Sequence, residues 1–104
     1  MPSLEQLEQL LAADPHDPFT LYALAQAHGK AERHGKALEF YDRCLAADPG
    51  YVYAYYHKAR VLLGQDDQAG ALAAAKAGLA KAREAAEAHA IGELLALLSE
   101  IESA

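Results

Sequence analysis

Apolar residues recur at steps of three and four along most of the chain, which is the spacing of one face of an α-helix. In the stretch 18–30 this apolar stripe is formed by Leu21, Leu24, Ala25 and His28. Asp17 and Pro18 stand just before it, an N-cap residue followed by proline at the first helical position, where the missing N–H costs no hydrogen bond. The pattern predicts a helix over 18–30, a short turn at 31–33 and a second helix over 34–47.

The pattern also repeats at a fixed interval. The segment Leu10–Pro15 recurs as Cys44–Pro49, a displacement of 34 residues without any insertion. The same shift predicts a second helix pair, with a first helix over about 52–64 and a second helix, capped by Asp66 or Asp67, that reaches about residue 83. A unit that repeats in this way cannot bury its apolar face alone, so the two helix pairs are expected to stack on each other.

Each end of the chain carries one further amphipathic segment. Ser3 and Gln6 form a capping box before a stripe that copies the second helix of a repeat, namely Leu4, Leu7, Leu10 and Leu11. A stripe near the C-terminus is opposed by glutamates and comprises Ile91, Leu94, Leu95, Leu98 and Ile101. No proline separates this stripe from the second repeat, but we expect a break near 84–86, because a fused rod would leave its apolar side uncovered.

These residues resemble the tetratricopeptide repeat (TPR) family, whose pattern combines aromatic, Leu, Tyr and small residues with a closing proline. Repeat one matches at Leu21, Leu24, Ala25, His28, Ala37, Tyr41 and Pro49; repeat two matches at Tyr55, Ala59, Leu62, Ala71 and Gly78. His28 lies where the family has a packing tyrosine, so the resemblance implies that it is buried in the core. Repeat two departs from the pattern at Lys58, Ala75 and Arg83. Small residues suit such a fold because helix backbones approach closely only where side chains are short.

The resemblance implies an all-α fold, an α-α superhelix (TPR solenoid) of about six antiparallel helices that include N- and C-terminal capping helices. Residues 1–104 are then a single TPR domain. Its expected parts are a capping half repeat at 3–15, repeat one at 16–49, repeat two at 50–83 and a capping helix at 86–103.

The TPR resemblance further implies a protein-protein interaction module, a non-catalytic adaptor or scaffold that binds a peptide or helix of a partner protein in a concave groove. The family's groove positions fall here on Phe19, Tyr22, Gln26, Lys30, Tyr53, Tyr56, His57, Arg60 and Leu63. Aromatic residues and arginine dominate this set, and such residues often anchor interfaces. Packing is the alternative role for the tyrosines, since aromatics at helical spacing also fill cores.

Arg60 could pair with a carboxylate in a bidentate manner, which favours an acidic or C-terminal segment as the partner. The lysine and asparagine clamp that the family uses for chaperone tails is not matched, because this chain has Tyr22, Gln26, His57 and Arg60 instead. A chaperone-tail receptor is therefore not expected. His57 and Arg60 lie one turn apart on the same predicted face and form a candidate pH-sensitive contact.

Composition and charge bear on the partner, the location and the redox state that can be expected for this protein. A formal net charge of -6 disfavours a nucleic-acid partner, since that binding depends on Lys and Arg. No apolar run approaches the length of a membrane span, and the N-terminus lacks a basic stretch and an apolar signal region, which together predict a cytoplasmic protein without a membrane partner. The single cysteine, Cys44, cannot form an intramolecular disulfide and is expected to be buried.

No catalytic motif is apparent, and we expect neither an enzyme nor a cofactor. The five histidines show no metal-ligand spacing, so a histidine-based metal protein is a remote alternative. A nearer alternative is a self-associating structural subunit, a homodimer formed through the C-terminal helix by Leu94, Leu95, Leu97 and Leu98.

Overall fold

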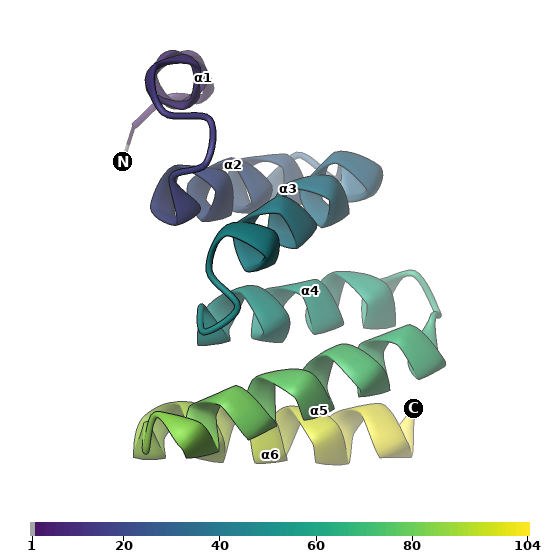
Figure 1. The fold of residues 1–104 in the computed structure, drawn as a ribbon. Helices are drawn as coiled ribbons and strands as arrows, with labels where there is room; N and C mark the ends of the chain where they lie inside the picture. Colours follow the sequence, from purple (N-terminus) through teal and green to yellow (C-terminus); the bar gives the residue numbers. More distant parts are fainter. Residues whose placement is uncertain (1) are drawn as a thin grey trace. The chain divides into compact units, whose positions relative to one another are not determined.

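The computed structural model describes residues 2–104, which form six α-helices and no strand (Figure 1). The helices are α1 (Leu4–Ala13), α2 (Pro18–Lys30), α3 (His34–Ala47), α4 (Val52–Gly64), α5 (Gln68–Glu84) and α6 (Ala88–Ser103). The predicted all-α class is confirmed. The chain divides after Pro49 into two compact units, unit 1 with α1–α3 and unit 2 with α4–α6, and each is described by itself.

Side-chain caps fix where three of the helices begin. The Ser3 hydroxyl accepts from the Gln6 backbone N–H at 3.1 Å while the Gln6 side chain accepts from the Ser3 N–H at 2.8 Å, which is the predicted capping box. Asp17 accepts from the Thr20 N–H ahead of Pro18. Of the two candidate caps for α5, Asp67 accepts from the Gly70 N–H at 2.9 Å, whereas Asp66 lies in the turn.

Three turns of one type connect α2 to α3, α4 to α5 and α5 to α6. Each contains one residue in the left-handed region, Glu32 (φ 58°), Asp66 (φ 61°) or Ala86 (φ 55°). In each turn the residue after the left-handed one donates its backbone N–H to the carbonyl five residues before it, as Glu87 does to Ala82 at 3.0 Å. This is the Schellman motif, which ends one helix and reverses the chain. The predicted turn at 31–33 and the predicted break near 84–86 are both confirmed.

The core of unit 1 forms where α2 packs against α3 and against α1. Leu7, Leu21 and Leu24 are buried, as are Tyr41 and Cys44. His28 is also buried, as expected, with its ring stacked on Phe40 at a centroid distance of 5.4 Å. Burial, then the nearby Arg33 and Lys36, lower the pKa of His28, so the neutral ring accepts a hydrogen bond from Arg33 Nε at 3.0 Å.

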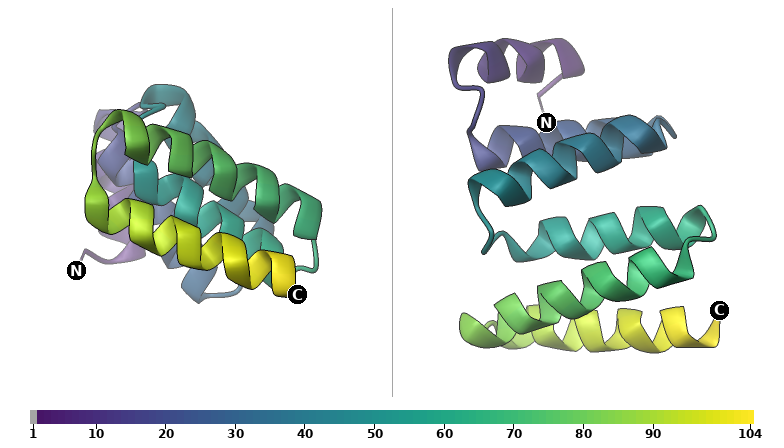
Figure 2. Two further views of the ribbon diagram at one scale, coloured as in Figure 1. Left: turned by 90° about the horizontal axis from the view of Figure 1, so that it is seen from below. Right: turned by 45° about the vertical axis from the view of Figure 1, so that its right-hand side comes forward.

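Unit 2 is a three-helix arrangement in which α5 packs against α4 and α6. The two views of Figure 2 show α5 and α6 side by side and running in opposite directions. The Gln68 side chain at the start of α5 donates to the Ile101 carbonyl near the end of α6 at 2.7 Å, consistent with this direction. None of the helices within residues 2–104 is both long and apolar enough to cross a bilayer.

The apolar stripe on α6 is buried within its own unit. Leu94, Leu97 and Leu98 belong to the buried core of unit 2, and only Leu95 is substantially exposed, at 46%. The predicted homodimer surface of Leu94, Leu95, Leu97 and Leu98 is therefore wrong for three of its four residues. The physical reason is that α6 folds back on α5 at residue 86, so its own unit buries the stripe that an extended rod would have exposed.

Small residues let α5 approach its neighbours closely. Ala71, Ala75 and Ala82 are completely buried, and a Cβ placed on Gly78 would lie 2.7 Å from the Cβ of Tyr55. The departures from the repeat pattern fit this packing: Ala75 is a small side chain at a close contact, and α5 without a closing proline continues to Glu84.

Gly78→Ala should lower the free energy of unfolding by about 1–3 kcal/mol, because the added methyl group overlaps Tyr55 at a tightly packed contact. Gly92→Ala in α6 is the matched control, since nothing lies within 4 Å of its Cβ position and alanine favours a helix by about 1 kcal/mol. Urea unfolding followed by circular dichroism should move in opposite directions for the two variants. Equal shifts would contradict the close approach.

Ala86→Gly should raise the free energy of unfolding by about 1 kcal/mol, because alanine pays a steric penalty at φ 55° that glycine does not. Ala85→Gly next to it, at φ -86°, should instead cost about 0.5–1 kcal/mol through lost backbone restriction. The same urea titration separates the two. Destabilisation by both variants to the same extent would argue against the left-handed turn.

Candidate functional site

The candidate residues of unit 1 lie along one face of α2. Phe19, Tyr22, Gln26 and Lys30 follow one another at steps of three and four residues. Phe19 is the most exposed large hydrophobic side chain in the described residues, at 63%, and Lys30 is exposed at the other end of the helix. Tyr22 and Gln26 are half-buried between them. We call these four residues the α2 face.

A short hydrogen-bond chain holds the middle of the α2 face. The Tyr41 hydroxyl donates to Gln26 Oε1 at 2.6 Å, and Gln26 Nε2 donates to the Tyr22 hydroxyl at 3.1 Å. The rings of Tyr22 and Tyr41 also meet edge to face at 6.1 Å. Burial raises the pKa of Tyr22, with a smaller contribution from Cys44, so its hydroxyl stays protonated. Gln26 is thus a positioning residue that fixes the Tyr22 ring.

The candidate residues of unit 2 form an aromatic cluster on α4. The Tyr53 and Tyr56 rings meet at 6.1 Å, and the Tyr56 and His57 rings at 5.1 Å. The Arg60 guanidinium lies over the Tyr56 ring at 5.8 Å from its centroid. The three rings are half-buried and Arg60 is exposed. Leu63 packs against the buried core of unit 2, and so do Tyr53 and Tyr56, which therefore contribute to stability as well.

α6 adds acidic partners to this cluster. The Tyr53 hydroxyl donates to Glu93 Oε1 at 2.7 Å, and Arg60 pairs with Glu100 at 3.4 Å. His89 also contacts Glu93, at 2.8 Å. Tyr53 and Arg60 are seven residues apart on α4, as are Glu93 and Glu100 on α6, so the two helices run parallel with matching faces. Tyr53, Tyr56, His57 and Arg60 together with Glu93 and Glu100 are called the α4–α6 face.

Sequence reasoning missed these glutamates. The acidic residues near the C-terminus were visible as the polar side of an amphipathic helix, but nothing in their spacing shows which helix they approach. The signal that could have found them is an interval of seven residues, about two helical turns, which separates Tyr53 from Arg60 and also Glu93 from Glu100. Residues at this interval lie on the same face of a helix, so two such pairs can face each other.

His57 is neutral at pH 7. Burial lowers its pKa, the neighbouring Arg60 lowers it further, and Glu93 opposes the shift. The proposed pH-sensitive contact between His57 and Arg60 would therefore operate only below the ordinary range of histidine. At neutral pH the α4–α6 face presents aromatic rings and paired charges.

Cysteine and metal chemistry can be examined residue by residue in the described part of the chain. Cys44 is buried, and burial together with Asp48 and Asp17 raises the pKa of its thiol to about 11, which makes it a poor nucleophile. Within residues 2–104 no three His, Cys, Asp or Glu side chains are placed to hold a metal ion. The arrangement suits binding through contact area and hydrogen bonds.

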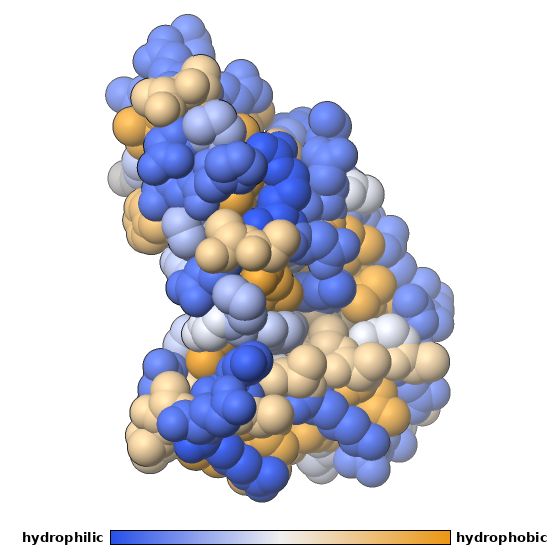
Figure 3. Space-filling view, viewed as in Figure 1, coloured by the Kyte–Doolittle hydropathy of each residue, from blue (hydrophilic) through white to orange (hydrophobic). Residues whose placement is uncertain are grey.

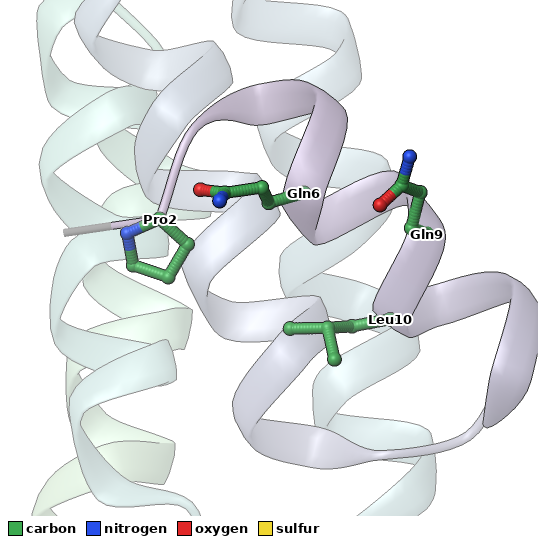
Figure 4. A pocket seen from close by; sticks show the side chains of 4 residues that line it. All are labelled: Pro2, Gln6, Gln9 and Leu10. Atoms are coloured by element: carbon green, nitrogen blue, oxygen red, sulfur yellow. The ribbon is translucent and has the colours of Figure 1, made fainter.

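Two shallow hollows lie outside the predicted site, both in unit 1. One, of about 570 Å³, is lined by Pro2, Gln6, Gln9 and Leu10 on one side of α1 (Figure 4). The other, of about 460 Å³, is lined by His16, Leu21, Arg43, Ala46 and Ala47. In unit 2, the face seen in Figure 3 has α5 in front. There mildly hydrophobic surface alternates with strongly hydrophilic side chains, in keeping with a helix rich in alanine that also carries two lysines and an arginine.

Known structures resemble this one closely. A tetratricopeptide repeat domain protein from Salinibacter ruber is 34% identical, with a TM-score of 0.80 over 86% of this chain and 91% of that chain. The TPR2B domain of yeast Sti1, in its complex with pHsp70, is 21% identical with a TM-score of 0.91 over 96% of this chain and 80% of that one. PcrH, in complex with the chaperone binding region of PopD, is 19% identical with a TM-score of 0.90 over 96% and 76%.

The sequence comparisons agree with the structural ones. The family model described as tetratricopeptide repeat matches residues 18–61, which span α2, α3 and most of α4. No functionally curated protein matches the chain significantly. The match of the family model and the 34% identity over most of both chains agree with the internal period of 34 residues. This chain belongs to the tetratricopeptide repeat family.

Proposed function

We propose that this chain is a non-catalytic protein-interaction module that binds a peptide or helix of a partner protein, and that the α2 face of unit 1 and the α4–α6 face of unit 2, each taken by itself, are its candidate binding surfaces. The observation that carries the proposal is the gathering of aromatic side chains on α2 and α4, with Phe19 exposed at 63% and Tyr53 and Tyr56 partly buried against the core of unit 2. Contact between water and the apolar ring of phenylalanine costs free energy, and a partner that covers the ring recovers this free energy.

The chemistry of these side chains suits recognition. Aromatic residues and arginine supply most of the binding free energy at protein interfaces, because each buries a large area while losing few rotatable bonds. The rings of Tyr22, Tyr53 and Tyr56 are already held by contacts with Tyr41, Glu93 and each other. A partner would therefore meet a surface whose side chains are largely ordered before binding.

Structures with the same fold support the kind of partner. The yeast Sti1 domain was solved in a complex with pHsp70, and PcrH with a region of PopD, so both bind another polypeptide. Their identity to this chain is 21% and 19%, which extends to the fold and not to the residues of the site. We accordingly propose the class of ligand, a polypeptide segment, from the fold, and its chemistry from the side chains of this chain.

The predicted preference for an acidic or C-terminal segment depends on Arg60. Its guanidinium already has a carboxylate partner in Glu100. A partner carboxylate would have to compete with Glu100, so the aromatic rings are the principal attraction in the function proposed here.

The proposal is tested by panning a phage-displayed random peptide library against the purified chain, then measuring the dissociation constants of recovered peptides. Phe19→Ala or Tyr56→Ala should weaken binding at least about tenfold, as expected when an aromatic anchor is truncated. Leu95→Ala is the control, since Leu95 is similarly accessible at 46% but lies on α6 outside both faces, and it should bind as the unmodified chain does.

Circular dichroism must first show that each variant is folded, which matters most for the half-buried Tyr56. Recovery of no peptide above background would overturn the proposed function. Peptides that bind both aromatic variants with unchanged affinity would instead remove these two faces as the binding surface.

A further inference from the structure

We propose that Glu100 sets the charge preference of the α4–α6 face: it occupies Arg60 as an internal carboxylate, so the face selects uncharged or basic segments and disfavours acidic ones. This inference rests on the function proposed above and specifies the partner chemistry of the same surface. It reverses the preference that Arg60 alone would give.

The geometry places Glu100 where an acidic ligand would bind. Its Oε1 lies 3.4 Å from Arg60 Nη1, and the two side chains are 53% and 44% exposed, so the pair sits at the accessible edge of the face. The same guanidinium lies over the Tyr56 ring at 5.8 Å. A partner carboxylate that approached Arg60 along this ring would meet the like charge of Glu100.

The other charged groups on the face act in the same direction. Glu93 carries a second carboxylate, whose Oε1 accepts from the Tyr53 hydroxyl at 2.7 Å and lies 2.8 Å from His89 Nε2. His57 is uncharged at pH 7 for the reasons given above. The α4–α6 face thus carries two carboxylates and one guanidinium, and a peptide that brings a Lys or Arg meets complementary charge while its apolar side chains cover the rings.

An exposed ion pair of this kind contributes little to folding, because water and salt screen it and two long side chains must be ordered. Glu100→Gln should therefore fold normally while it releases Arg60 for other carboxylates. Glu102→Gln makes the same change in net charge on an exposed residue of the same helix and serves as the matched control.

The test pans the same random peptide library against the unmodified chain and against the Glu100→Gln and Glu102→Gln variants, followed by sequencing of the recovered pools. We expect Asp and Glu to be enriched about threefold in the Glu100→Gln pool relative to the other two. Adding Arg60→Gln to Glu100→Gln should abolish this enrichment.

The outcomes separate the two proposals. Pools with the same acidic content for the unmodified chain and Glu100→Gln overturn this inference while peptide binding itself stands. Equal enrichment with Glu102→Gln also overturns it, because net charge alone would then explain the change. Recovery of no peptide by any of the proteins removes the proposed function and this inference with it.

Discussion

The close packing of each helix against a neighbour in its own unit is the constraint on which the rest of the structure depends. Helices of 10 to 17 residues are at best marginally stable alone in water, so each needs a partner to cover its apolar stripe. α5 meets α4 through alanines and through Gly78, whose backbone approaches Tyr55 too closely for another carbon atom. Where side chains are this short, the backbones themselves set the distance between the two helix axes.

This packing decides which side chains of α4 and α6 lie opposite each other on the accessible side of unit 2. In unit 2, α5 lies antiparallel to both α4 and α6, which makes α4 and α6 parallel and brings Tyr53 and Arg60 opposite Glu93 and Glu100. The turn at Ala86 is essential to this result because it returns α6 along α5. The acidic residues of the α4–α6 face thus reach α4 through a turn that lies outside this face.

The family pattern and the chemistry of the faces answer different questions. Membership of the tetratricopeptide repeat family accounts for the helix pairs and for the small residues at the contacts. It does not choose the aromatic rings of Phe19, Tyr53 and Tyr56 on α2 and α4, on which the proposed recognition of a polypeptide depends.

The sequence alone determined the helices and their ends, because these depend on local chemistry: a step of three or four between apolar residues, the caps at Ser3 and Asp17, and the turn at 31–33. It also determined that His28 and Cys44 would be buried. It misjudged Leu94, Leu97 and Leu98, since a stripe shows that a helix is covered without showing by what. Only the tertiary structure decided that unit 2 itself covers the apolar stripe of α6 and that Glu100 reaches Arg60, forty residues earlier. Such pairings depend on how helices fold back in space, so no local sequence pattern reveals them.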